Sequence, residues 1–374
     1  MKLARGRRMT RVTHLRAERA GGESRVTALV DGVPLWFACE DMGLTAAPEA
    51  FGSALLLASL HRNRPLSIDG AVSETWRDNV RRLSEIWSEW WGYRIAKTEI
   101  ITRPDRVDRS SGTALAFSCG IDSFHALLTA PRPQILVSVH GFDVPLADDY
   151  RMSAFALSAK AVAAATGVKS TTVRTNLREH PSSGRPRLWE RSHGGGLASI
   201  AHVLSDHLGE LTISSSYFAR DQRAWGSAIE TDPLFSSDRM GIAHYGAHAH
   251  REEKIRQIAD NPLVQRHLRV CWANRAESGN CSRCGKCLAT MLLLAELGSL
   301  DSFEVFDGMK LLPSRLDELP HLSTQINIVE RIVERGFLPR PVAEATRKLV
   351  KRSRRAAAIR EYGNRLRDTV LPRA

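Results

Sequence analysis

Four of the six cysteines of this chain are spaced as metal ligands. Cys271 is followed by Cys281, Cys284 and Cys287. Two residues separate Cys281 from Cys284, and two separate Cys284 from Cys287. Such short loops let four thiolates close a tetrahedral shell around Zn²⁺ without strain. An iron–sulfur cluster also takes four cysteines and is the alternative. The spacing favours a structural zinc site, which would contribute on the order of 10 kcal/mol of folding free energy.

A second candidate for chemistry is the segment Ser118-Cys119-Gly120-Ile121-Asp122-Ser123, between an apolar run and a helical pattern. The first turn of a helix carries unpaired N–H groups and a positive dipole end, and both favour a phosphate. The two serines add hydroxyl donors, and the glycine allows close backbone approach to a ligand. The aspartate would cap the helix or lie near a Mg²⁺ ion that bridges phosphate oxygens. The segment predicts a nucleotide phosphate cradle, and a chance turn is the alternative.

Two other segments are expected at the rim of the same sheet. His140, Gly141 and Phe142 end and follow an apolar strand, where a nucleoside could bind. Ligands of parallel sheets bind beyond the carboxyl ends of the strands. Gly195 lies in a run of three glycines before an expected helix at 197–208, and would allow a second close approach to an anion or a base. A plain loop is the alternative for the glycine run.

The sequence FSCGIDSFHALL resembles the SGGxDS signature of the PP-loop ATP pyrophosphatases. That family cleaves ATP between the α- and β-phosphates and forms an adenylate, from which a nucleophile then displaces AMP. The resemblance implies that Ser118, Gly120, Asp122 and Ser123 hold the pyrophosphate. Cys119 departs from the family, which usually has glycine there. A cysteine at a helix N-terminus is alternatively a reactive thiol with a lowered pKa.

Together with the downstream cysteines, this motif resembles the 7-cyano-7-deazaguanine synthase branch over roughly residues 111–298. The segment REEKIRQIADNPLVQRHLRVCW is similar to the basic helix that leads to the first zinc cysteine in that branch. Those enzymes use ATP to convert 7-carboxy-7-deazaguanine and ammonia into an amide and then a nitrile. The resemblance implies that Arg251 and Lys254 contact phosphate or carboxylate and act with Asp122 and Ser123 in catalysis. An exposed helix face is the alternative for both basic residues.

The elements that must position these residues alternate between strands and helices. Short apolar runs separated by helical patterns predict a parallel sheet that is covered on both faces. We therefore expect an α/β fold with a Rossmann-like sheet of the PP-loop or HUP type. The expected strands are 114–118, 135–140, 169–175 and 210–216, and the expected helices are 122–129, 150–166 and 197–208.

The rest of the chain is expected to form separate parts. Asp31-Gly32 between apolar runs predicts a hairpin, and tryptophans recur at helical spacing over 73–92, where a core face is favoured over a binding face. The polar segment 101–112 is broken by proline and predicts a linker. Residues 217–250 lose regular pattern and resemble a functional lid.

The expected domains are an α+β domain at 1–108, a catalytic domain at 109–300 with its zinc site at 271–287, and a basic helical region at 301–374.

Composition limits the partners. The 374 residues are 43% hydrophobic and 25% charged, which is typical of a globular protein. The net charge of +12 favours anionic partners. A basic helix expected at 342–368 would bind nucleic acid or an acidic protein, or be a solvated surface. The chain has no membrane-spanning run and no secretory signal, and its cysteine clustering favours a cytoplasmic setting.

These observations predict an ATP-dependent C–N ligase that uses ATP, Mg²⁺ and Zn²⁺. It would adenylate a small-molecule carboxylate similar to 7-carboxy-7-deazaguanine, form an amide or nitrile, and release AMP. Relatives of this branch occur in anti-phage gene clusters, where a deazaguanine-related ligation is directed at a protein partner, and the N-terminal addition suits a protein acceptor. The alternatives are a PP-loop tRNA-modifying thiolase or amidase, and a nucleotide-binding scaffold subunit with weakened turnover.

Overall fold

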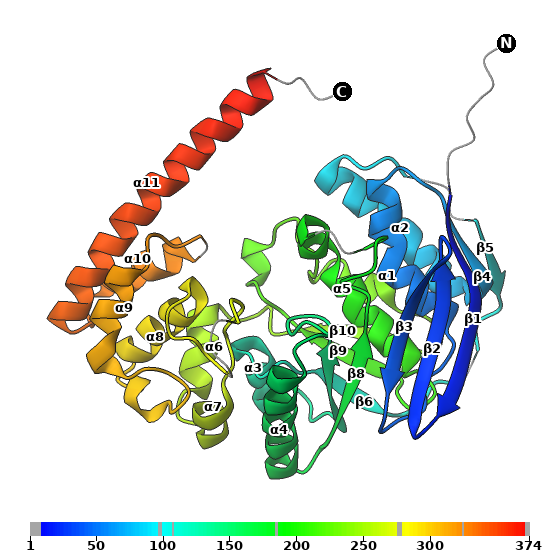
Figure 1. Ribbon diagram of the computed structural model, residues 1–374, viewed down its shortest axis with the longest axis horizontal. Helices are drawn as coiled ribbons and strands as arrows, with labels where there is room; N and C mark the ends of the chain where they lie inside the picture. The colour runs from blue at the N-terminus through cyan, green and yellow to red at the C-terminus, as the bar shows by residue number, and fades with distance from the viewer. Residues whose placement is uncertain are drawn as a thin grey trace. The chain divides into compact units, whose positions relative to one another are not determined.

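The computed structural model describes residues 9–95, 99–106, 108–183, 186–274, 279–323 and 325–370. The chain divides into two compact units (Figure 1). The first unit contains residues up to Ser118 and residues 122–251, and the second contains residues 119–121 and those from Glu252 onward.

One ten-stranded sheet runs through the first unit in the order β10-β9-β6-β7-β8-β3-β2-β1-β4-β5. The strands are β1 (Thr10–Ala20), β2 (Glu23–Val30), β3 (Val33–Cys39), β4 (Leu66–Ser73), β5 (Glu99–Arg103), β6 (Thr113–Ala116), β7 (Ile135–His140), β8 (Lys169–Thr175), β9 (Glu210–Ser214) and β10 (Gly241–Tyr245).

The half of the sheet from β10 to β8 is entirely parallel. Its connections include α3 (Ile121–Thr129), α4 (Asp149–Thr166) and α5 (Pro186–Val203). The strand β7 is buried at most positions, as expected for a strand with a helix on each face. The predicted α/β class with a largely parallel sheet is therefore confirmed.

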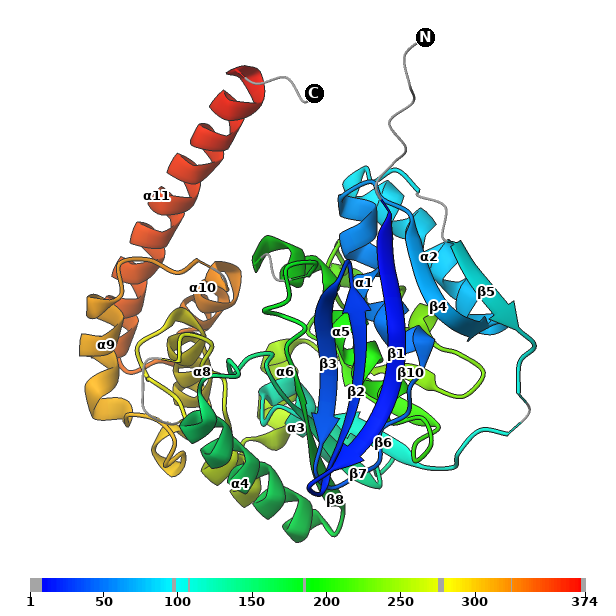
Figure 2. The ribbon, with the colours of Figure 1, turned by 45° about the vertical axis from the view of Figure 1, so that its right-hand side comes forward.

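The other half of the sheet begins with the meander β1–β3, whose strands lie side by side in Figure 2. The last strand of the meander, β3, pairs antiparallel with β8, so both halves form one continuous sheet. Side chains strengthen this join, because Trp36 N–H donates to Asn176 Oδ1 at 3.0 Å and Thr175 Oγ1 donates to the Trp36 carbonyl at 2.8 Å. The division expected between residues 108 and 109 therefore does not separate the two units.

Two tryptophans of the N-terminal region are part of the core. They lie on α2 (Glu74–Trp91), whose N-cap residue is Ser73, and Ser73 Oγ accepts from Trp76 N–H at 3.1 Å. Trp76 and Trp87 are fully buried, and Trp76 Nε1 donates to Ser53 Oγ on α1 (Pro48–His61) at 3.1 Å. The core interpretation of the tryptophan spacing is confirmed for these two residues.

The second unit is helical. Its helices are α6 (Arg251–Ile258), whose first residue belongs to the first unit, α7 (Pro262–His267), α8 (Gly285–Glu296), α9 (Leu312–Glu318), α10 (Ile326–Arg335) and α11 (Arg340–Val370). Short 3₁₀ helices occur in both units: η1 (Ala219–Asp221), η2 (Asp232–Phe235), η3 (Leu300–Ser302) and η4 (Met309–Leu311). Among the described residues, no helix has the length and apolar character needed to cross a membrane.

Candidate functional site

The four predicted metal ligands come together in the second unit. The sulfur atoms of Cys271, Cys281, Cys284 and Cys287 all lie within 4.8 Å of one another. The Cys271–Cys284 and Cys281–Cys287 sulfur pairs are each 4.0 Å apart, and the Cys284–Cys287 pair is 3.5 Å apart. A tetrahedral zinc with Zn–S bonds of about 2.3 Å requires sulfur atoms roughly 3.8 Å apart. The four cysteines can therefore hold a metal ion such as zinc.

The backbone around the cysteines is arranged to support thiolates. Cys284 N–H points at Cys281 Sγ at 3.3 Å. Asn280 fixes the first ligand, because its Oδ1 accepts from Val270 N–H at 2.8 Å and Cys271 N–H at 3.1 Å. The hydrogen bonds with Cys284 and Cys287 lower the pKa of the Cys271 thiol, and the same contacts with Cys271 raise the pKa values of Cys284 and Cys287. Asn280 was not predicted from the sequence, although its position beside Cys281 is a signal for such a role.

The predicted phosphate cradle lies at the carboxyl end of β6. β6 lies between β7 and β9, and the chain passes from β6 to β7 and β8 before it returns to β9 on the opposite side. The topology therefore reverses at β6, and in open parallel sheets ligands bind at such a switch point. Ser118 N–H and Ser118 Oγ each lie 3.4 Å from Ser123 Oγ, so the two serines face each other across the turn.

Asp122 and Arg251, predicted from separate motifs, form an ion pair in the first unit. Arg251 Nη1 lies 3.0 Å from Asp122 Oδ2, and their side chains are 15% and 18% exposed. Asp122 belongs to the first turn of α3, which begins at Ile121, so it does not occupy the N-cap position that we expected as one of its two roles. The pair instead holds a guanidinium beside the N-terminus of α3.

Cys119 occupies a backbone conformation that favours glycine. Its φ is 55°, in the left-handed region, and its side chain is fully buried. Burial raises the pKa of the thiol to about 12, although Arg269 opposes this shift. The interpretation of Cys119 as a reactive thiol with a lowered pKa is therefore wrong, because desolvation outweighs the helix terminus.

His140, Gly141 and Phe142 lie at the same edge of the sheet as Ser118, but several of their atoms serve the fold. His140 Nε2 donates to the Pro145 carbonyl at 3.0 Å. Gly141 has a φ of 107°, and a Cβ there would lie 2.0 Å from the Thr175 carbonyl oxygen. Phe142 is buried with its ring centroid 4.6 Å from that of Trp189. The glycine is therefore required by the close approach of β8.

Gly195 lies inside a helix rather than before one. The helix expected to start at 197 begins at Pro186, so all three glycines are within α5. A Cβ on Gly195 would lie 2.4 Å from the Ser53 carbonyl oxygen on α1 and 3.1 Å from the Phe235 ring. The glycine therefore permits close packing of α5 against α1, and its backbone is not at a helix terminus that would bind an anion.

Lys254, in the second unit, is not on an exposed helix face. Its side chain is 1% exposed, which is unusual for a lysine. The same helix buries Glu252, whose Oε1 accepts from Arg331 Nη2 at 2.6 Å. The exposed-face alternative is therefore wrong for Lys254.

A buried polar cluster in the segment expected to be an irregular lid was not predicted. Asp232 Oδ2 accepts from Ser227 Oγ at 2.6 Å and from His244 Nδ1 at 2.7 Å, where His244 lies on the unpredicted strand β10. Within the described part of the chain, Asp232 Oδ1 and His244 Nε2 are buried without a hydrogen-bond partner. Burial lowers the pKa of nearby His193, although Asp232 opposes this shift. Only the density of Asp, His and Ser between 217 and 250 pointed to such a cluster.

The basic C-terminal helix uses several of its arginines within the second unit. Arg352 Nη2 donates to the Leu316 and Leu319 carbonyls at 2.9 and 3.0 Å. Arg354 pairs with Glu330, and Leu349 and Ser353 are fully buried. This part of α11 is therefore a packed helix rather than a fully solvated one.

Comparisons with family models, with curated proteins and with solved structures found no match for this chain. The assignment of chemistry therefore depends on the residues and the geometry given above.

Proposed function

We propose that the chain is an ATP-dependent ligase that activates a carboxylate as its adenylate and transfers the acyl group to an amine. The observation that carries the proposal is the turn 118–123 at the carboxyl end of β6, beside the Asp122–Arg251 pair. A helix N-terminus, two serines and a guanidinium at a topological switch point suit a bound polyphosphate.

The strand order supports the same proposal, because it puts the motif on the central strand of the parallel half. The parallel half runs β8-β7-β6-β9-β10, so its first strand in the chain is central and carries the motif. A switch point offers one crevice for the nucleotide, and the neighbouring strand end at His140–Phe142 is close enough in the sheet to contribute to it. This arrangement fits the PP-loop type of fold that the motif FSCGIDSFHALL resembles.

In the proposed reaction, a carboxylate oxygen attacks the α-phosphorus of ATP, and the bond from that phosphorus to the bridging oxygen breaks. Pyrophosphate leaves with the electron pair, and an amine then attacks the acyl carbon, loses a proton and releases AMP. Ser118, Ser123 and the N–H groups of the α3 terminus would bind the β- and γ-phosphates. Arg251, positioned by Asp122, would neutralise developing charge. A Mg²⁺ ion, when bound, would supply further charge neutralisation on the phosphates.

The proposed substrate is an acid similar to 7-carboxy-7-deazaguanine, with ammonia or a protein amine as acceptor. The support is the combination of the 118–123 motif with a four-cysteine cluster that fits zinc. Zinc at this cluster would have a structural role, because four cysteines leave no open coordination position.

Product analysis tests the proposal. Purified protein with Mg²⁺, ATP, ammonia and 7-carboxy-7-deazaguanine is expected to release AMP and pyrophosphate in equal amounts, and Asp122→Ala is expected to lower the rate by about 10²-fold. Asp149→Ala is the matched control, because Asp149 is an exposed residue in the first turn of α4. Release of ADP in place of AMP would contradict the proposal, as would equal ATP affinity and rate in Asp122→Ala and wild type.

A further inference from the structure

The middle of α11, residues 345–360, carries a large share of the positive charge of the chain. Seven of these residues are Arg or Lys, and none is Asp or Glu. Since the whole chain has a net charge of +12, this segment alone contributes +7 of it. The C-terminal half of α11 extends beyond α9 and α10 in both ribbon views (Figure 1 and Figure 2). The second unit therefore concentrates positive charge on one long helix.

One face of this segment packs against the rest of the second unit. Leu349 and Ser353 are fully buried there. The basic residues at the border of this face have partners. Arg352 donates to two carbonyl oxygens at the end of α9, and Arg354 Nε donates to Glu330 Oε1 at 2.6 Å. These contacts determine which face of α11 points outward.

The outward face carries four exposed basic residues, Arg347, Lys348, Lys351 and Arg355, which we call the basic face. Within the described part of the chain, none of the four has an ion pair or a side-chain hydrogen bond. Lys351 lies four residues from both Arg347 and Arg355, so these side chains are neighbours on the helix. Like charges at this spacing destabilise a helix by about 0.2–0.5 kcal/mol per pair.

The carboxylates of the neighbouring helices do not relieve this repulsion. Glu318, Glu330 and Glu344 each pair with an arginine outside the basic face. Asp317 and Glu334 are the remaining acids of α9 and α10, and they form no ion pair with α11 among the residues that the structure describes. The positive charge of the basic face is therefore in surplus within its own unit.

The position of these residues in the helix does not account for them either. The helix dipole stabilises cations within about the last turn of a helix. Arg355, the last residue of the basic face, lies fifteen residues before Val370, where α11 ends. An anion from outside the chain is therefore the group that would relieve the repulsion.

The chemistry of the basic face favours nucleic acid over other anionic partners. An amphipathic helix binds a membrane through its apolar face, and the apolar face of α11 packs on its own unit, with Ile359 at 73% exposure as the exception. Protein interfaces are enriched in aromatic residues and depleted of lysine, whereas the basic face has two lysines and no aromatic residue. A phosphate backbone, in contrast, is bound by Lys and Arg charges alone.

We propose that the basic face of α11 binds the phosphate backbone of double-stranded nucleic acid without reading its sequence. Arg347 and Arg355 are separated by roughly 12 Å along the helix, at about 1.5 Å per residue. Duplex DNA carries one negative charge per about 1.7 Å of its axis, so roughly seven phosphates lie along that length. Four cations can therefore each contact a phosphate. The inference goes beyond the proposed ligase reaction and does not depend on it.

Fluorescence anisotropy of a short labelled DNA duplex, titrated with the full-length protein at several salt concentrations, tests the proposal. The logarithm of the affinity should fall linearly with the logarithm of the salt concentration, with a slope of about −3.6 for four phosphate contacts. Lys351→Ala and Arg355→Ala should each reduce the magnitude of this slope by about 0.9, and Lys351→Arg should retain it. Arg81→Ala is the matched control, because it removes the same charge from an 81% exposed side chain on α2.

A matched RNA duplex distinguishes the two sources of a phosphate backbone, and binding of either duplex with these slopes supports the proposal. Equal slopes in wild type, Lys351→Ala and Arg355→Ala would place the nucleic acid on another surface and overturn it. Failure of wild type to bind either duplex at low salt would overturn it as well. A polyglutamate peptide that binds as tightly as the duplexes would contradict the assignment of a phosphate backbone.

Discussion

Cys119 combines a left-handed backbone with a fully buried thiol. A residue other than glycine in this conformation costs of order 1–3 kcal/mol. The surrounding structure must therefore hold it in place, and one such contact is the hydrogen bond from Arg269 N–H to the Cys119 carbonyl at 2.8 Å. The strain lies within the turn that we propose binds ATP, where backbone strain is often part of a site.

The raised pKa of Cys119 predicts a pH dependence of stability. The pKa is about 12 in the folded chain against an ordinary value of 9.0, so the folded state binds more protons than the unfolded state between these values. Stability should fall as pH rises above 9, by up to about 1.4 kcal/mol per pH unit from this group. Chemical denaturation of wild type and Cys119→Ala at two pH values above 9 measures the difference. Equal pH slopes in the two proteins would contradict the assignment.

At the scale of elements, α5 depends on its glycines for contact with α1. Gly195→Ala is expected to lower the free energy of unfolding by about 1–3 kcal/mol, because its Cβ would lie 2.4 Å from a backbone oxygen. Gly43→Ala is the matched control, since its Cβ would meet only His207 Nε2 at 3.4 Å. Thermal and chemical denaturation report the effect. Unchanged stability together with weakened ATP binding would instead support a ligand role for Gly195.

The periodicity of apolar residues was sufficient to predict the buried parallel strands β7 and β8. It was insufficient to predict β1 or the beginning of α5. β7 and β8 match the predicted ranges residue for residue, because each is a short run bounded by turn residues. β1 was missed since most of its residues are exposed and polar, and its pairing with β2 and β4 is what makes it a strand. The beginning of α5 was missed because three glycines indicate a loop unless a second helix packs closely against them.

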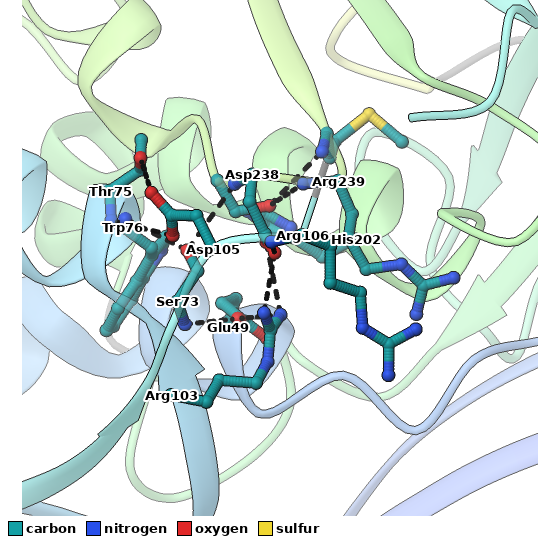
Figure 3. Close-up of polar contacts among 12 residues, drawn as sticks. Glu49, Ser73, Thr75, Trp76, Arg103, Asp105, Arg106, His202, Asp238 and Arg239 are labelled. Carbon is teal, nitrogen blue, oxygen red and sulfur yellow. Dashed lines mark hydrogen bonds and ion pairs between the residues drawn. The ribbon is translucent and has the colours of Figure 1, made fainter. Parts of the chain in front are cut away.

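The candidate site was predictable where its residues are close in sequence. The metal cluster could be predicted from cysteine spacing. Residues 118–123 were indicated by one contiguous motif, and their role in binding ATP stays a prediction. In the Asp122–Arg251 pair, Arg251 was predicted as a site residue only through the family resemblance. Outside the candidate site, Arg103 Nη1 lies 2.5 Å from Asp238 Oδ2 (Figure 3), and this ion pair joins an expected linker to an expected lid. No local pattern indicates a contact between positions that distant in the chain.

At the scale of the whole molecule, the metal cluster is expected to determine the stability of the second unit. Metal analysis should find one zinc per chain without iron, and a chelator should increase hydrogen exchange in α8, whose first turn carries Cys287, while β6–β9 remain protected. Cys284→Ser should reproduce this effect, and Cys39→Ala, a buried cysteine outside the cluster, should not. A metal-free protein with unchanged exchange in α8 would contradict a structural zinc site.

Isotope exchange tests the central claim most directly, because it detects adenylation before any acceptor reacts. Labelled pyrophosphate is mixed with the protein, Mg²⁺, ATP and 7-carboxy-7-deazaguanine, without ammonia. We predict that label enters ATP only when the carboxylate is present, and that Asp122→Ala lowers the rate of this exchange by about 10²-fold while Asp149→Ala retains it. Consumption of ATP with formation of ADP and no exchange of pyrophosphate would contradict the account.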